Sequence, residues 1–195
     1  MLAAVILAAG ESRRMGTPKA LLPYRGKTFL AHLLEVTRHP RIGVQRVVVG
    51  AHAAEIRKAG VLPESSVLEN PEWERGQLTS IQAAVRNLLP GQTDGMLLCL
   101  VDHPLISAAL VDTLITSFYS SGKPIVLPTY RRKRGHPAIF SSTLYDDLLA
   151  APLDVGARAV VWQHASEVLE VPTEEEGVML NLNDPETYRR IVGQE

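Results

Sequence analysis

Short apolar runs alternate with helix-spaced segments along almost the whole chain, and this alternation is the feature that most restricts its fold. The first run, Leu2 to Leu7, is continuously apolar, as in a strand that is buried on both faces. The segment 28–38 then has apolar residues near helical spacing, and His39-Pro40 ends it. Strand–helix–strand order of this kind predicts a parallel sheet with helices on both faces.

The later part of the chain continues the alternation. We expect further strands at residues 47–50, 66–68, 96–101, 125–127 and 168–171, and further helices at 53–59, 78–89, 107–119, 141–150, 155–163 and 185–191. Pro90-Gly91 is expected to end the helix at 78–89. The run 96–101 is the most apolar one and stops at Asp102. We therefore expect it at the centre of the sheet, with the Asp102 carboxylate at its C-terminal edge.

The composition limits the classes of function. Twenty Lys and Arg against twenty-one Asp and Glu give 195 residues a net charge of -1, unlike the basic surface of a dedicated nucleic-acid binder. Cys99 is the single cysteine, which excludes an intramolecular disulfide and fits a reducing compartment. Residues 1–195 are therefore expected to form a single domain in the cytoplasm, with no nucleic-acid partner and no membrane span.

The loop directly after the first predicted strand carries the clearest functional pattern. Gly10 and Gly16 allow a tight backbone path with exposed N–H groups. Arg13, Arg14 and Lys19 place three cations around the same loop. The pattern predicts a cradle for a polyphosphate, and the alternative is a solvated basic loop whose charges point in different directions. The spacing matches neither a P-loop nor the glycine-rich dinucleotide motif.

The run LAAGESRRMGTPKALLP at 7–23 resembles the signature of the MobA-like NTP transferases of molybdenum cofactor biosynthesis, and among them it most resembles the cytidylyltransferases. Five further segments resemble motifs of that family in the same order: NPEWERGQLTS at 70–80, VDHP at 101–104, RGHP at 134–137, DVGAR at 154–158 and NLNDPE at 181–186. The six motifs cover nearly the whole chain.

The resemblance implies both a fold and an activity. The implied fold is α/β, a three-layer αβα sandwich around a Rossmann-like, doubly wound, mostly parallel sheet of the nucleotide-diphospho-sugar transferase type. The nucleotide would lie over the C-terminal ends of the strands, as in other open sheets. The implied activity is the Mg²⁺-dependent transfer of CMP from CTP to a molybdopterin-type cofactor, with release of pyrophosphate.

The resemblance also assigns roles to individual residues. Arg13, Lys19 and Asp102 are the implied catalytic residues, and the first two would contact the NTP phosphates. The implied nucleotide-binding residues are Leu7, Ala8, Ala9, Gly10, Arg13, Lys19, Asn70, Gly76, Thr79 and Ser80. For Asn70, Thr79 and Ser80, the alternative is ordinary capping of the helix that follows Gly76. Lys19 is expected to lie in an exposed loop, and Trp73 and Trp162 are expected to be packing anchors.

Two positions are candidates for holding Mg²⁺. Asp102 offers a hard oxygen ligand at the end of an apolar strand, and the alternative is an ordinary loop or capping carboxylate. The resemblance places Asn183 at the second metal position, where an amide oxygen is a weaker ligand than a carboxylate. The neighbouring Asp184 is therefore kept as a rival ligand, or as the cap of the final helix that starts at Pro185.

Arg134 and His136 are the candidate substrate-binding residues. A basic turn, Arg131 to Arg134, precedes the histidine, and such a turn suits an anionic pterin-dithiolene substrate. The alternative is a solvated hairpin in which His136 is a packing residue. His103, which follows Asp102 directly, is expected to be a bystander.

Three other functions remain open from the sequence. A nucleotidyltransferase of the same fold could use GTP, or could act on another phosphorylated acceptor such as a sugar phosphate or a phosphorylated alcohol. A non-catalytic protein could bind molybdenum cofactor and deliver it to another enzyme. A molybdoenzyme or its chaperone is the candidate protein partner.

Overall fold

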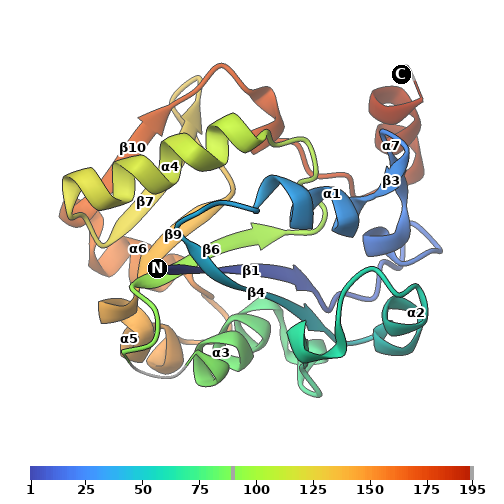
Figure 1. The fold of residues 1–195 in the computed structure, drawn as a ribbon, viewed down its shortest axis with the longest axis horizontal. Coiled ribbons are helices and arrows are strands. Elements are labelled where there is room, and N and C mark those ends of the chain that lie inside the picture. The colour runs from blue at the N-terminus through green and yellow to red at the C-terminus, as the bar shows by residue number, and fades with distance from the viewer. Residues whose placement is uncertain (89–90, 194–195) are drawn as a thin grey trace.

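A computed structural model describes residues 1–88 and 91–193 (Figure 1). Its main sheet has eight strands, in the order β10-β7-β9-β6-β1-β4-β5 with β8 paired to β7. The strands of this sheet are β1 (Leu2–Ala8), β4 (Ile42–Val49), β5 (Val67–Glu69), β6 (Gly95–Leu100), β7 (Ile125–Tyr130), β8 (Lys133–Arg134), β9 (Ala138–Ser141) and β10 (Val168–Pro172). A separate hairpin pairs β2 (Pro23–Tyr24) with β3 (Lys27–Thr28).

Helices cover both faces of the sheet (Figure 1). They are α1 (Phe29–Val36), α2 (Ala53–Lys58), α3 (Gln77–Asn87), α4 (Ala108–Ser121), α5 (Tyr145–Ala150), α6 (Arg158–Gln163) and α7 (Pro185–Val192). Alternate residues of β1 face opposite sides because side chains along a strand alternate. Leu2 and Ile6 pack in the core under α1 and α4, whereas Val5 and Leu7 pack in the core that includes α3. The predicted three-layer αβα sandwich is confirmed.

The strand order reverses next to β1. Strand β1 pairs in parallel with β4 on one side and with β6 on the other. The chain runs from β1 outward to β4 and β5, and then returns to form β6. The carboxyl ends of β1 and β6 therefore meet at a topological switch point, where open sheets of this kind bind ligands. The predicted central position of the strand before Asp102 is confirmed.

Two strands, β8 and β9, run against the others, and among the described strands β8 pairs with β7 alone. Strand β9 is antiparallel to both β6 and β7, and the sequence pattern did not predict this direction. Only seven residues, 131–137, separate β9 from β7. A parallel connection needs a crossover of a dozen residues or more, so this link permits only an antiparallel return.

Several boundaries differ from the predicted ones. Strand β4 begins at Ile42 and not at residue 47, because its first half also pairs with β1. Helix α6 begins at Arg158 and not at residue 155, because Gly156 adopts a φ of 77°, outside the helical region. The predicted helix end at Leu89 and Pro90 lies outside the described residues. Within the part of the chain that is described, no helix is both long and apolar enough to cross a membrane.

Candidate functional site

The loop after β1 folds around Ser12. The backbone N–H of Met15 donates to the Ser12 carbonyl at 2.8 Å, and the N–H of Lys19 donates to Ser12 Oγ at 3.1 Å. Gly16 lies at a φ of 65°, a left-handed conformation that costs glycine little. The loop turns back over the end of β1 and directs the side chain of Lys19 toward the switch point.

Three predicted site residues meet there. The Lys19 ammonium lies 3.3 Å from Asp102 Oδ2 and also donates a hydrogen bond to Asn183 Oδ1. The three side chains come from the loop after β1, the end of β6 and the segment before α7. A hydrogen bond of 2.7 Å from the Leu182 N–H to the Asp102 carbonyl ties that last segment to the end of β6. The expectation that Lys19 lies in an exposed loop is wrong, because its side chain is only 15% exposed.

The oxygen pair suits a divalent cation. Asp102 and Asn183 direct a carboxylate and an amide oxygen at one position, which the ammonium group of Lys19 now contacts. Oxygen ligands of this kind suit Mg²⁺, which keeps several waters and is completed by substrate phosphates. The described residues contain no group of three or more His, Cys, Asp or Glu that could hold a metal alone. A bound nucleotide would therefore have to supply part of the coordination.

Asp184, the rival ligand, is the N-cap of α7. Its Oδ1 accepts from the Thr187 N–H at 2.8 Å, and its Oδ2 accepts from Thr187 Oγ1 at 3.0 Å. These two hydrogen bonds hold the pKa of the Asp184 carboxyl below its usual value. Both oxygens are thus used by the helix, as capping predicts. Asn183 is the one of the two whose side chain contacts Lys19, which in turn contacts Asp102.

A cavity of about 190 Å³ lies above this cluster. The predicted residues that line it are Leu7, Ala8, Ala9, Gly10, Lys19, Ser80 and Asp102. The cavity is also lined by His52, Trp73 and Gln77, for which the sequence predicts no role in the site. His52 follows the end of β4, so the rule that placed Asp102 at the edge of the sheet applied to it as well.

His52 adds a titratable group to the cavity wall. Its Nε2 lies 2.8 Å from the Glu11 carbonyl, and its Nδ1 lies 3.2 Å from Glu55 Oε1. Burial alone lowers the pKa of this imidazole, but the two hydrogen bonds more than offset that effect and raise it above its usual value. The cationic form of His52 is thus more favoured here than in a free imidazole, next to a cavity that Lys19 also lines.

Asn70 and Thr79 stabilise the wall of the cavity from behind. The buried Asn70 amide donates to Thr79 Oγ1 at 2.8 Å and to Ser80 Oγ at 2.9 Å, and its Oδ1 accepts from the Glu72 N–H at 3.0 Å. Thr79 is further bonded to the carbonyl of Gly76, the residue that precedes α3. Neither Asn70 nor Thr79 lines the cavity, whereas Ser80 does.

Arg13 lies away from the cavity in this structure. Its side chain is 82% exposed and pairs with Glu11 of the same loop. Trp73 packs over Gly50, where an added Cβ would lie 2.7 Å from the indole ring. Trp73 is therefore both a packing residue, as predicted, and part of the cavity wall.

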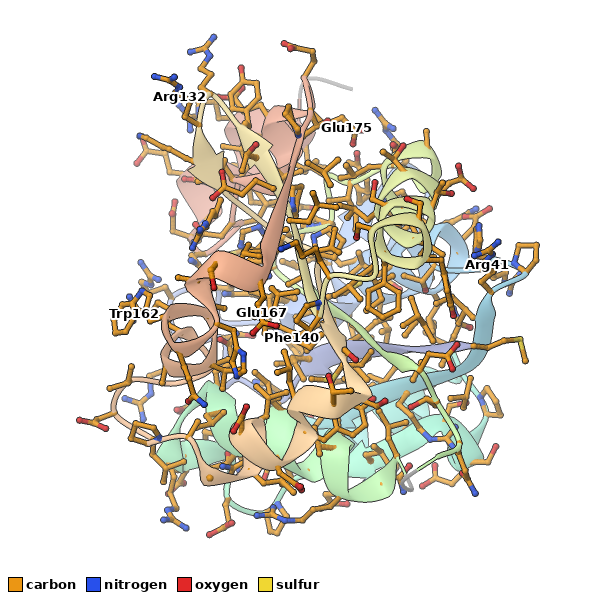
Figure 2. All side chains as sticks on the ribbon, turned by 90° about the vertical axis from the view of Figure 1, so that its left-hand side faces the viewer. Arg41, Arg132, Phe140, Trp162, Glu167 and Glu175 are labelled. Carbon is orange, nitrogen blue, oxygen red and sulfur yellow. The ribbon has the colours of Figure 1, made fainter. Side chains whose placement is uncertain are left out.

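A second cavity, of about 640 Å³, adjoins the first and shares Gln77 with it. It contains both predicted substrate-binding residues, Arg134 and His136. The other lining residues come from the start of α3, from β6, β7 and β9, and from the segment 153–162. Arg131 to Lys133 are exposed and do not line it, so only the last residue of the predicted basic turn reaches the cavity. Figure 2 shows Arg132 at the edge of the molecule.

The residues of the RGHP segment, 134–137, pack closely against their neighbours. Arg134 forms an ion pair of 2.8 Å with Glu170, and a Cβ on Gly135 would lie 2.5 Å from the carbonyl oxygen of Val178. The His136 ring contacts that of His103 edge-on, at 5.2 Å between centroids. Burial and the neighbouring His103 lower the pKa of His136 to about 4, so its imidazole is neutral at pH 7. His103 is therefore a packing partner of a site residue.

Trp162 is not the packing anchor that the sequence suggested. Its side chain is 62% exposed and lines the second cavity. Figure 2 shows it at the edge of the molecule, on α6 and well apart from Arg132 at the tip of the β7–β8 hairpin.

Comparisons with known proteins give the family. A model of the MobA-like NTP transferase domain matches residues 4–168. Nicotine blue oxidoreductase of Paenarthrobacter nicotinovorans is 31% identical over 171 residues, which cover 82% of this chain and 80% of the relative. A probable molybdenum cofactor guanylyltransferase of Mycobacterium avium is 28% identical, with 97% and 94% of the two chains covered.

A solved structure supports the fold over nearly the same length. The manganese complex of Rv0371C from Mycobacterium tuberculosis superposes with a TM-score of 0.78 at 27% identity, covering 98% of this chain and 97% of that one. The family model spans most of the chain, and the matched range 4–168 includes the loop that carries Lys19. The protein therefore belongs to the MobA-like NTP transferase family, a family of nucleotidyltransferases.

Proposed function

We propose that the protein, as a single domain of residues 1–195, transfers CMP from CTP to a molybdopterin-type cofactor and releases pyrophosphate. The observation that carries this proposal is the meeting of Lys19, Asp102 and Asn183 beneath a cavity at the switch point of the sheet. Relatives that are named molybdenum cofactor guanylyltransferases support the acceptor class. The single buried cysteine supports the cytoplasm as its location.

The transfer requires an oxygen of the acceptor phosphate to attack the α-phosphorus of CTP, while the bond to the β-phosphate breaks and pyrophosphate leaves. Asp102 and Asn183 would hold Mg²⁺, which when bound neutralises charge on the phosphates. The Lys19 ammonium is then available to donate to the phosphate oxygens, on which negative charge grows during transfer. The loop that folds on Ser12 holds Lys19 in position before the substrate arrives.

The backbone of Leu7 to Gly10 forms the wall on which we place the cytosine. Ser80 Oγ accepts from Asn70, which leaves its own hydroxyl hydrogen free to donate to the base or ribose. Asn70 and Thr79 act on the nucleotide through Ser80, since they position it without lining the cavity. A pocket that pairs with polar groups of one base leaves them unsatisfied with another, and this is the basis of its selectivity.

The second cavity would hold the acceptor. It contains Arg134 and His136, and it shares Gln77 with the nucleotide cavity. An acceptor bound there can therefore present its phosphate at the boundary where the α-phosphate lies. A molybdoenzyme or its chaperone is the protein partner that would receive the product.

Side-by-side kinetics with CTP and GTP, each with molybdopterin and Mg²⁺, test the proposal. We expect kcat/KM for CTP to exceed that for GTP at least tenfold, about 1.4 kcal/mol. Equal rates, or faster turnover with GTP, would leave a nucleotidyltransferase but overturn the cytidylyl assignment. Pyrophosphate release only with a sugar phosphate or a phosphorylated alcohol would change the acceptor, and no release with any NTP would favour a non-catalytic delivery protein.

A further inference from the structure

Helix α6 forms one wall of the second cavity, and this wall has no assigned role. Apart from Met1 at the start of the chain, Trp162 is the only exposed large apolar side chain among the described residues. An indole gains stability from burial, and an aromatic ring that faces a cavity often supplies contact area for a ligand. Trp162 belongs to neither cluster of core residues, so core packing does not explain its position.

Arg158 lies about one helical turn before Trp162 on α6. Arg158 and Trp162 are four residues apart on α6, a spacing that brings side chains to the same face of a helix. Both line the cavity. Arg158 is exposed and forms no ion pair with any described residue, whereas Arg134 in the same cavity is paired with Glu170. Asp154 is the only acidic residue that lines the cavity, among those described.

Trp162 and Arg158 line a cavity that adjoins the proposed nucleotide cavity. Gln77, the first residue of α3, borders both cavities. The second cavity is the larger one, about 640 Å³ against about 190 Å³. A ligand with a fused ring system can thus occupy it while a substituent extends past Gln77 to the nucleotide.

We infer that Trp162 stacks on a planar, fused heterocyclic ring of the acceptor and that Arg158 binds an anionic group on that acceptor. The inference rests on the proposed function, because the acceptor proposed above contains such a ring and such charges. It assigns recognition of the ring to α6, and it leaves the handling of the transferred phosphate to Lys19 and Asp102.

Intrinsic fluorescence tests the inference without any turnover. The chain has two tryptophans, and the structure places one in each cavity. The variant Trp73→Phe leaves Trp162 as the only indole, and Trp162→Phe leaves only Trp73. Pterin-6-carboxylate, a planar ring with one anionic group, is the probe, and inorganic phosphate is the control for an anion without a ring. We expect the probe to quench Trp162 in a saturable manner and to leave Trp73 unchanged.

The role of Arg158 is tested in the Trp73→Phe background. Arg158→Ala should weaken binding of the probe at least tenfold, and Arg132→Ala should leave it unchanged, because that exposed arginine does not line the cavity. Both replaced side chains are exposed, so the variants are expected to fold. Unchanged binding by Arg158→Ala would overturn the role of the cation. Quenching of Trp73 in place of Trp162, or no saturable quenching of Trp162, would overturn the role of the ring.

Kinetics extend the test to the proposed reaction. Trp162→Ala should raise the KM for molybdopterin at least tenfold, with the KM for CTP unchanged. An unchanged KM for molybdopterin would contradict the stacking. If the protein transfers no nucleotide at all, the kinetic experiment exposes the failure of the proposed function, and the fluorescence result still decides the inference about α6.

Discussion

The two cavities that meet at Gln77 are built from different parts of the molecule. The smaller one lies over the carboxyl ends of β1 and β6, and its lining includes the ion pair of Lys19 with Asp102, which Asn183 contacts through Lys19. The larger one lies between the start of α3, the strands β7 and β9, and α6, and it combines apolar residues with the exposed ring of Trp162. The enclosed ion pair and the exposed aromatic ring thus lie in adjoining but separate cavities.

The difference has a physical basis. Groups that stabilise developing charge act best when they are fixed before reaction. Lys19 meets this condition, because its backbone is bonded to Ser12 and its side chain is largely enclosed. A ring that binds a planar ligand must instead remain open to solvent until the ligand covers it, as Trp162 does. The following experiments test this division, from the largest expected effect to the smallest.

Removal of the Lys19 charge should have the largest effect. Lys19→Ala should lower kcat for nucleotide transfer about 30- to 900-fold, which corresponds to a loss of about 2 to 4 kcal/mol of transition-state stabilisation. Pyrophosphate release measures the rate. Lys27→Ala is the matched control, since that exposed lysine lies in the β2–β3 hairpin and pairs with Glu35. Near-normal activity of Lys19→Ala would contradict the assignment of the smaller cavity.

His136 in the larger cavity should make stability depend on pH. Its pKa is about 4 in the folded protein and about 6.5 in an unfolded chain, because burial disfavours the charged ring. Below pH 6.5 the unfolded chain binds a proton that the folded protein does not. The free energy of unfolding should therefore fall as the pH is lowered from 6.5 to 4, by about 3 kcal/mol in all.

Urea denaturation at a series of pH values measures this effect. His136→Phe should show a weaker fall than the wild type over the same window, because it lacks the titrating ring. His164→Gln is a control of opposite sign: hydrogen bonds with Glu167 and Asp147 raise the pKa of that imidazole, so its removal should not weaken the fall. An equal fall in wild type and His136→Phe would place the titrating group elsewhere.

Much of the smaller cavity could be predicted from the sequence, because it follows from local rules. Apolar runs predict strands, and the residues after them gather at one edge of a parallel sheet, as Lys19, Asp102 and the unassigned His52 do. The contact between Lys19 and Asn183 spans 164 residues and depends on how the segment before α7 packs. The resemblance to a family placed Asn183 at a metal position but did not predict its contact with Lys19, and local pattern carries no information about that contact.

The larger cavity was harder to predict, for two reasons. Its wall depends on the antiparallel direction of β9 and on the late start of α6, and neither is visible in hydrophobic periodicity. A tryptophan in a helix also has the same sequence signature whether it is buried or exposed. The sequence therefore predicts a packing role for Trp162, which is the usual role of a large apolar side chain.

Replacement of the Asp102 carboxylate should change the metal requirement. Asp102→Asn should raise the Mg²⁺ concentration for half-maximal activity at least tenfold, about 1.4 kcal/mol, and lower kcat more than nucleotide affinity. A titration of activity with Mg²⁺ measures this. Asp112→Asn is the matched control, because Asp112 lies on α4 and pairs with His39. The same Mg²⁺ dependence in Asp102→Asn and wild type would remove Asp102 from the metal site.

The smallest expected effect distinguishes Asn183 from Asp184 as the metal ligand. Asp184→Ala removes both capping bonds to Thr187 and should lower the free energy of unfolding by about 1 kcal/mol, measured by urea denaturation. It should leave the Mg²⁺ requirement unchanged, whereas Asn183→Ala should raise that requirement and leave the α7 cap intact. Asp184→Asn, which retains an oxygen for capping, should recover part of the lost stability. If Asp184→Ala instead raised the Mg²⁺ requirement and Asn183→Ala did not, the Asp184 carboxylate would be the ligand in place of Asn183.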